Sequence, residues 1–452
     1  MTRPTRSRLN TFVPPRPSPG LIRLLVPVNR ILGLAGIPAL RRIPILNWLP
    51  GIRGLADIVR IDLPAADLAR LRAAIGPTTA AFIAPNHPEF MTDWLLDKEL
   101  STLAAPLIAS WATHDIVNGM GPLMQSFWLK NNLIAQIPGE GGAAGKAYSV
   151  EWALAGHGVL LHPEGLVGWH GHTIGPLFPG VTDMALEALQ RTRRERTGLD
   201  VHVRPVVWRL RFLVDVDGAL AREMSYVERR LGLRATPGAN VAQRVHDAYL
   251  ALLERDESAA GAGHGTGSYR ARQARLLAHL AARLRQLGVV SAGVAGNDPA
   301  EECHALLRLA ERLLRQPSAE QHASDSGDLR DAVKIARRLL RFSPNLYPDR
   351  TLAQEQVAEN IKRLRFDYCF GGLWDTLARL APRPAGPRAV SIRVPEPIRL
   401  NDLVAAGDET NADMRSTLLA LLRMRMQENM DRLGQELQSP AAGRSYTNPF
   451  FE

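Results

Sequence analysis

The sequence predicts an α/β fold: a mostly parallel mixed sheet flanked by helices, with a helical insertion and a basic amphipathic N-terminal segment. Short apolar runs alternate with helical periodicity between residues 57 and 212, as in a parallel sheet. Residues 213–387 are instead rich in Leu, Ala and Arg at helical spacing, and 388–398 return to strand alternation. With 46% hydrophobic residues, a chain of 452 residues can bury a large core.

The N-terminal region is basic throughout. Residues 1–20 are rich in Pro and Arg and are predicted to form a disordered basic tail. In residues 21–56, short apolar runs alternate with arginines, and nine arginines precede the first acidic residue, Asp57. This pattern predicts helical structure at the interface of an anionic membrane; a basic helical hairpin packed on the protein is the alternative. No run of 18 apolar residues predicts a membrane span, and no cleaved signal is expected.

Residues 57–212 are expected to form the core of the fold. The predicted strands are 80–84, 106–109, 133–137, 158–161 and 202–207. The predicted helices are 65–75, 93–100, 145–155 and 181–194, with Thr92 or Asp93 as the N-cap of the second.

The second half is predicted to be an insertion into this core. Residues 213–387 are expected to be helical at 241–254, 269–286, 299–315, 328–342 and 351–368. Residues 388–438 then supply a strand and a long amphipathic helix to the core, and 439–452 form a loose tail. A separate C-terminal domain is the alternative to an insertion.

Charge and cysteine content limit the function classes. The net charge of +10 suits an anionic membrane, an acidic carrier protein or nucleic acid, but the basic residues are dispersed with few interleaved aromatics, which argues against nucleic acid. Cys303 and Cys369 are far apart, which excludes a disulfide framework and indicates a reducing compartment. The glycine-rich stretch 138–142 lacks the Lys-Ser/Thr of a phosphate-binding P-loop.

Two short motifs carry the candidate chemistry. Asn86-His87-Pro88-Glu89 follows the predicted strand 80–84, and Asp93 comes six positions after His87. A histidine whose far ring nitrogen is held by a carboxylate can act as a general base near neutral pH. His162-Pro163-Glu164-Gly165 follows the predicted strand 158–161 in the same way.

Together with Val203-Arg204-Pro205-Val206-Val207, these motifs resemble the glycerolipid acyltransferase family, which has an Asn-His…Asp box, a Phe-Pro-Glu-Gly box and a later Val-Pro strand. The segment Pro395-Glu396-Pro397-Ile398 also resembles the family's Gly-Glu-Pro-Ile strand, with Pro395 in place of glycine. The resemblance implies that His87 is the general base and Asp93 its partner. It also implies substrate-binding roles for five residues: Asn86, Glu89, Pro163, Glu164 and Gly165.

The resemblance further implies a donor, an acceptor and a location. The donor would be acyl-CoA or acyl-carrier protein, and the acceptor a lysophospholipid-like lipid. No metal or other cofactor is expected. The protein would be cytoplasmic and peripheral on the inner face of the membrane.

The sequence departs from the family pattern at three places. The family has four residues between histidine and aspartate, which would select Thr92, so Glu89 or Asp97 are alternatives to Asp93. Leu166-Val167 replaces the usual Thr-Arg, and the intermediate box, here 131–138, lacks its arginine. The residues that would bind the phosphate are therefore not identified, and neither is the acceptor. The candidate phosphate-binding cations are Lys130, Lys146, Arg204, Arg209 and Arg211.

Two rival functions and one rival site remain. The same base could activate water in an ester or thioester hydrolase, or the protein could be a non-catalytic lipid-binding protein of the membrane. His170 and His172 form a His-x-His pair, with His114 or His162 as a further ligand, but the sequence offers no third ligand at metal spacing, so the pair is interpreted as structural.

Overall fold

The computed structural model describes residues 11–41, 43, 45–46, 49–137, 141–165, 167–289, 299–315, 323–380, 384–437 and 443–451. The chain forms two compact units. Unit 1 contains Met1–Val214 and Leu377–Ala442, and unit 2 contains Asp215–Thr376 and Gly443–Glu452. Most of the helical region expected at 213–387 thus lies in unit 2, whereas residues 213–214 and 377–387 belong to unit 1.

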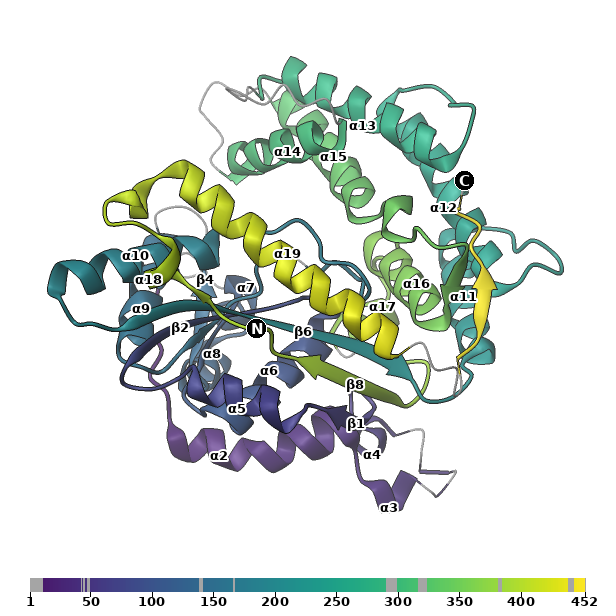
Figure 1. Cartoon of the computed structure of the whole chain (residues 1–452). Helices are drawn as coiled ribbons and strands as arrows, with labels where there is room; N and C mark the ends of the chain where they lie inside the picture. Colours follow the sequence, from purple (N-terminus) through teal and green to yellow (C-terminus); the bar gives the residue numbers. More distant parts are fainter. Residues whose placement is uncertain are drawn as a thin grey trace. The chain divides into compact units, whose positions relative to one another are not determined.

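Unit 1 is built around a mixed, mostly parallel sheet (Figure 1). Its strand order is β1-β8-β6-β2-β5-β3-β4, and the short β9 pairs with β6. β8 and β9 run antiparallel to β6, and every other neighbouring pair is parallel. The strands are β1 Ile58–Asp62, β2 Thr79–Pro85, β3 Ala109–Thr113, β4 Leu133–Gln136, β5 Val159–Leu160, β6 Asp200–Phe212, β8 Arg388–Arg393 and β9 Ile398–Arg399.

Alternating side chains of the central strands pack against helices on the two faces of this sheet. Phe82 and Val207 face the helices α9, α10 and α19, whereas Ile83 and Trp208 face α5 and α6. The helices of unit 1 are α2 Pro19–Val28, α3 Pro38–Arg41, α4 Pro50–Arg53, α5 Ala65–Ala73, α6 Phe90–Ala104, α7 His114–Val117, α8 Pro122–Lys130, α9 Gly141–Leu154, α10 Gly180–Glu195, α18 Leu400–Leu403 and α19 Ala412–Glu436, with a π-helical turn at Asn29–Ala35 and a 3-10 turn at Asp408–Thr410. The sheet is therefore covered on both faces, as expected for parallel strands.

Unit 2 is helical, with one small sheet. β7 Thr351–Ala353 and β10 Ser445–Thr447 form an antiparallel pair. Its helices are α11 Asp217–Leu231, α12 Val241–Ala260, α13 Tyr269–Gln286, α14 Pro299–Arg315, α15 Ala323–Arg341 and α16 Gln354–Tyr368, with a 3-10 turn at Pro344–Leu346; α17 Leu373–Leu380 spans the unit boundary.

Several sequence-based boundaries are wrong. The strand expected at 106–109 lies at Ala109–Thr113, because 105–108 form a turn closed by the bond from Ile108 N to Ala105 O. Residues 351–353, expected as the start of a helix, form β7 instead. Two further elements were not predicted from the sequence: the short edge strand β1 and the helix α11.

The two chain ends also differ from expectation. Residues 11–20, expected as part of a disordered tail, lie along unit 1, where Arg16 N and Ser18 N donate to the carbonyls of Leu129 and Lys130. The loose tail expected at 439–452 contains β10. Residues 1–10, 138–140, 438–442 and 452, as well as Leu166, lie outside the described residues.

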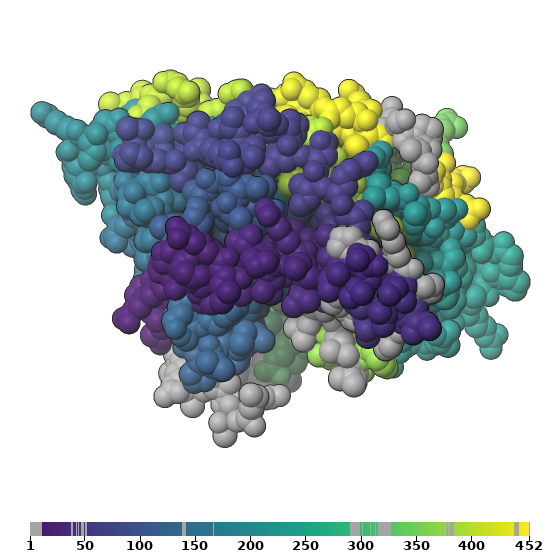
Figure 2. All heavy atoms as spheres, turned by 90° about the horizontal axis from the view of Figure 1, so that it is seen from below, coloured from purple at the N-terminus to yellow at the C-terminus, as the bar shows by residue number. Residues whose placement is uncertain are grey.

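The N-terminal helices lie on the surface of unit 1, where the purple segment crosses the molecule in Figure 2. Arg30 forms an ion pair with Glu99 of α6 at 2.7 Å, and Asn29 Nδ2 donates to Leu95 O at 3.1 Å. Among the described residues, one helical run, Pro19–Arg41, is long and apolar enough to cross a membrane by length and composition, although the sequence alone predicted none. Only 22% of its most apolar stretch is buried against the protein.

Candidate active site

His87 lies just beyond the carboxyl end of β2, at the edge of the sheet where the parallel strands end. Asn86 fixes this point of the chain: its Nδ2 donates to Trp208 O at 3.0 Å, and its Oδ1 accepts from Trp208 N at 2.8 Å. Asn86 is buried, and both ends of its amide are used by the backbone of β6. The side chain of Asn86 therefore sets the exit of the chain from β2, and its expected substrate-binding role stays a prediction.

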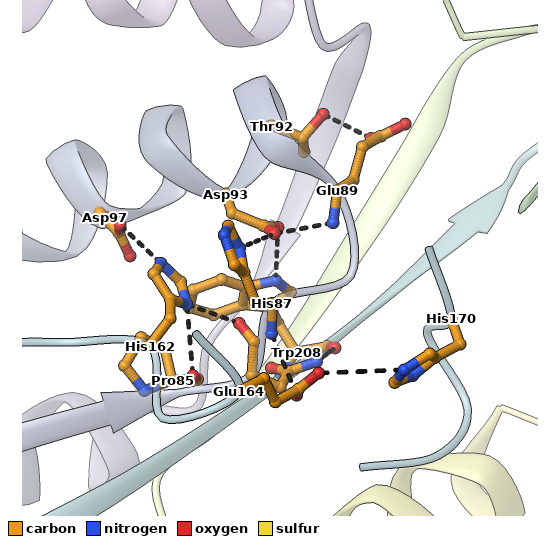
Figure 3. Close-up of polar contacts among 11 residues, drawn as sticks. Pro85, His87, Glu89, Thr92, Asp93, Asp97, His162, Glu164, His170 and Trp208 are labelled. Atoms are coloured by element: carbon orange, nitrogen blue, oxygen red, sulfur yellow. Dashed lines mark hydrogen bonds and ion pairs between the residues drawn. The ribbon is translucent and has the colours of Figure 1, made fainter. Parts of the chain in front are cut away.

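Asp93 holds the ring of His87. The distance from His87 Nδ1 to Asp93 Oδ2 is 2.8 Å (Figure 3). Glu89 N donates to the same oxygen at 2.7 Å, and Trp208 Nε1 donates to Oδ1 at 3.1 Å. These two N–H donors, one on each oxygen, favour an ionised carboxylate. This contact assigns the proton of the neutral imidazole to Nδ1 and leaves Nε2 as a base.

The helix start explains why Asp93, and not Thr92, faces His87. Glu89 has extended backbone, with φ −149° and ψ 116°, and α6 begins at Phe90, three residues before the predicted start. Asp93 thus lies in the first turn, facing back toward His87, while Thr92 Oγ1 donates to Glu89 Oε2 at 2.5 Å. Arg388 of β8 binds the same Glu89 oxygen at 2.5 Å. Glu89 is therefore not the partner of His87, because its carboxylate forms a buried ion pair with Arg388. Its expected substrate-binding role stays a prediction.

A second histidine–aspartate pair lies against the first. His162 follows β5, and its Nε2 is 3.0 Å from Asp97 Oδ2, one helical turn after Asp93 on α6. Its Nδ1 is 3.0 Å from the carbonyl oxygen of Asn86. The rings of His87 and His162 stack with centroids 4.1 Å apart and planes 19° apart. Asp97 is therefore the partner of His162 and not an alternative partner of His87.

The Pro163-Glu164-Gly165 corner supports the loop that carries His87. Glu164 Oε1 accepts from His87 N at 3.3 Å, and its Oε2 lies 4.0 Å from His170 Nε2. Gly165 adopts φ +67°, and a Cβ at this position would meet the Phe178 ring at 2.7 Å, so both conformation and space require glycine. Pro163 O accepts from Phe178 N at 2.7 Å.

Burial and neighbouring charge set the protonation of these groups. Burial and the adjacent His162 charge hold the pKa of His87 well below its usual value. Burial lowers the pKa of His162, but Asp97 and the Asn86 carbonyl outweigh it, so the pKa is raised overall. Burial raises the pKa of Glu164 to about 7. Burial and Asp97 also raise the pKa of Asp93, and the indole N–H of Trp208 opposes that rise.

Three of the five candidate phosphate cations are engaged in other contacts. Arg209 NH2 is 2.9 Å from His172 Nδ1, Lys146 pairs with Asp183 at 3.7 Å, and Arg204 NH1 donates to Pro395 O at 3.4 Å. His170 Nδ1 donates to Thr173 O at 2.6 Å, so His170 and His172 have separate partners. In the described ranges, no three His, Cys, Asp or Glu side chains are grouped to hold a metal ion.

Three residues of the site were not predicted from the sequence: His162 as the ring stacked on His87, Trp208 and Arg388. A signal for His162 was present, because both histidines stand two residues after adjacent parallel strands. Asp93 and Asp97 are also four residues apart, on one face of a helix. Trp208 and Arg388 become neighbours of Asp93 and Glu89 only through the pairing of β2, β6 and β8.

Comparison with known proteins adds no assignment: no family model matches the chain, and no curated protein matches it significantly.

Proposed function

We propose that this protein is an acyltransferase that moves a fatty acyl group from acyl-CoA or acyl-carrier protein to the hydroxyl of a lysophospholipid-like lipid. The observation that carries the proposal is the 2.8 Å contact between His87 Nδ1 and Asp93 Oδ2 beside the Pro163-Glu164-Gly165 corner. The side chain of His87 is 16% exposed, so a substrate can approach a ring that is otherwise enclosed.

In this reaction His87 moves one proton. As the acceptor oxygen attacks the thioester carbonyl, its proton passes to His87 Nε2 and the new C–O bond forms. When the tetrahedral intermediate collapses, the C–S bond breaks, and the thiolate takes that proton from His87. Asp93 stays ionised and stabilises the imidazolium between the two steps. The products are the acylated lipid and the free thiol, and the enzyme is unchanged.

The proposed site of action is the inner face of the cytoplasmic membrane. Support comes from apolar side chains of the N-terminal helices that face solvent, among them Leu24 at 67% exposure and Leu32 at 48%. Arg23 is exposed beside them, and Asn29 and Arg30 are bound to α6. A helix tied to the protein through one face and apolar on another suits the membrane interface. The net charge of +10 would add attraction to an anionic leaflet or to an acidic carrier protein.

The test is acyl transfer by the purified full chain. Radiolabelled acyl-CoA and acyl-carrier protein are offered with vesicles that contain a panel of lysolipids, and acylated lipid and free fatty acid are separated. We expect acylated lipid from the wild type and loss of at least about 10²-fold in His87→Gln. His157→Gln, at a histidine ring that packs against Trp152 in a tilted arrangement, is the matched control and should keep activity.

Two results would overturn the proposal. Free fatty acid without acylated lipid, lost in His87→Gln, would indicate a hydrolase. Vesicle binding with no turnover of either donor, and unchanged in a folded His87→Gln protein, would indicate a non-catalytic lipid-binding protein.

A further inference from the structure

We propose that Asp97 and His162 form a permanently charged pair whose imidazolium lies against His87 and keeps the catalytic base unprotonated. His162 is then a positioning residue: it exchanges no proton and contacts no reacting atom. The kinetic consequence rests on the proposed function, whereas the protonation states can be measured without any activity.

The hydrogen-bond partners of His162 identify its protonation state. A neutral imidazole has one donor and one acceptor nitrogen. Both ring nitrogens of His162 face oxygen acceptors, the Asp97 carboxylate at 3.0 Å and the Asn86 carbonyl at 3.0 Å. A carbonyl can only accept, so Nδ1 carries a proton, and an ionised Asp97 requires a second proton on Nε2. The geometry therefore describes an imidazolium.

Burial strengthens this pairing. The side chains of His162 and Asp97 are 10% and 5% exposed. An ionised carboxylate at this depth needs a compensating charge, and the His162 ring is the cation in contact with it. Where the sequence resembles the family's Phe-Pro-Glu-Gly box, His162 takes the place of phenylalanine, so a ring of similar shape brings a charge with it.

The stacked arrangement transmits that charge to His87. With ring centroids 4.1 Å apart, a second proton on His87 would place two cations face to face in an enclosed site. His87 is therefore kept neutral and ready to accept a proton. Once it has taken the acceptor's proton, the same repulsion favours its transfer to the leaving thiolate.

Other charged groups near the two rings also affect the protonation of His87 and His162. Asp93 and Asp97 come from α6, with Lys98 next to Asp97, and Arg388 of β8 acts on Asp93. Glu164 approaches from the corner after β5, and His170 lies beyond it. The carboxylates attract protons to both rings, so the difference between the rings comes from their partners: His162 has acceptors on both nitrogens, and His87 on one.

The direct test is NMR of the full-length protein with ¹⁵N-labelled histidine rings, titrated between pH 5 and 8. His162→Phe and His87→Gln assign the two rings. We expect both ring nitrogens of His162 to be protonated at pH 7, while His87 stays neutral to below its ordinary pKa of about 6.5. A neutral His162 at pH 7 would overturn the proposal whatever the protein catalyses.

The kinetic test is the pH dependence of kcat/KM. His162→Phe keeps a stacked ring and removes the charge, so the pKa of His87 should rise and the acidic limb should move up by at least about one pH unit. As the pH falls from the variant's pKa to that of the wild type, the ratio of wild-type to variant rate should grow about tenfold per pH unit, and below both pKa values it should stay constant. Burial raises the pKa of Glu164 to about 7, and His162 opposes that rise, so Glu164 also titrates in this range and shifts in the variant. Both proteins are therefore compared in a Glu164→Gln background, in which this carboxyl does not titrate. His157→Phe, the same change at the histidine ring that packs against Trp152, should leave the limb unchanged.

A second variant covers the case in which His162→Phe fails to fold because Asp97 is left buried and unpaired. His162→Phe with Asp97→Leu removes both members of the pair together. This double variant should fold and show the same raised limb. An acidic limb at the wild-type position in a folded double variant would contradict the proposal, and if no turnover is found at all, the NMR titration still decides.

Discussion

Which carboxylate holds His87 depends on a single residue position. The family pattern points to Thr92, but α6 begins at Phe90, and this start turns Asp93 toward His87 and Thr92 toward Glu89. Consecutive residues on a helix face directions about 100° apart, so a shift of one position changes the partner completely.

Asp93→Asn should abolish most activity while keeping the shape of the site. An amide can present N–H to the ring, which favours the tautomer with the proton on Nε2 and removes the base. We expect a loss of roughly 10²–10⁴-fold in kcat, with kcat/KM falling in parallel. Thr92→Val is the control: it should lower stability through Glu89 but leave the pH profile unchanged. Full activity in a folded Asp93→Asn protein would contradict the assignment.

Glu164 should make stability depend on pH. The pKa of its carboxyl is about 4.5 in an unfolded chain and about 7 in the fold. Between these values the folded state holds more protons, so the free energy of unfolding falls as pH rises. Below about 4.5 and above about 7 the contribution is constant. Relative to Glu164→Gln, the wild type should lose about 3 kcal/mol between pH 4.5 and 7, measured by urea unfolding. Parallel pH curves for the two proteins would contradict this.

At the scale of elements, the site depends on strands and helices that are distant in sequence. β8 brings Arg388 to Glu89, and the same guanidinium donates to Ala56 O at 2.6 Å. The turn that leads into α6 is thus held by a strand 299 residues later in the chain. A substitution that disrupts β8 should therefore also change the position of Asp93.

Arg388→Met should be strongly destabilising. It leaves the Glu89 carboxylate buried without its cation, a loss expected to cost about 3–5 kcal/mol in the free energy of unfolding. The measurement is chemical denaturation. Arg388→Met with Glu89→Leu removes both charges and should recover most of the loss. If the double variant is as unstable as the single one, the packing of Arg388 and not its charge is what matters.

The N-terminal helices should determine membrane binding. Leu24→Ser with Leu32→Ser removes two exposed apolar side chains and should weaken binding to anionic vesicles by roughly 10²-fold or more, since each large apolar side chain contributes roughly 1.5–3 kcal/mol when buried. Vesicle co-sedimentation measures this. Leu123→Ser on α8, at 83% exposure, is the matched control and should bind as the wild type does. Equal binding by all three proteins would exclude these helices as the contact.

At the scale of the whole molecule, unit 1 contains the complete candidate site. Its two main apolar clusters draw on β2, β6, β8 and the helices around them, and none of their members belongs to Asp215–Thr376. Leu213 N, one residue before the chain leaves unit 1, donates to Pro387 O at 2.9 Å, so the two segments of unit 1 are joined close to the exit point. This arrangement is what an insertion requires.

Unit 1 should therefore fold without unit 2. A chain in which a short Gly/Ser linker replaces residues 215–383, and which ends at Leu437, should unfold cooperatively with its helix and strand content retained. Circular dichroism during thermal unfolding is the measurement, and the labelled rings of His87 and His162 report on the site. Loss of cooperative unfolding would show that unit 2 is needed to stabilise unit 1.

The elements that the sequence predicted best are the long, strongly periodic ones. The helices 269–286 and 299–315 have the predicted ends, and β2 and α10 differ from prediction by a residue or two at their ends. Periodicity is a local property, so it can be recognised without the rest of the fold. Short edge strands such as β1 carry little pattern of their own and form because a partner strand is present.

The sequence by itself determined that His87 and Glu164 follow buried strands at turns. It also determined that acidic residues, Asp93 and Asp97, lie on the helix that follows His87. The tertiary structure alone decided which acid serves which ring, that Glu89 and Asn86 hold the scaffold, and that His162 stacks on the base. The physical reason is that hydrogen-bond partners and ring stacking depend on distances of a few ångströms between side chains from different strands, and strand pairing sets those distances.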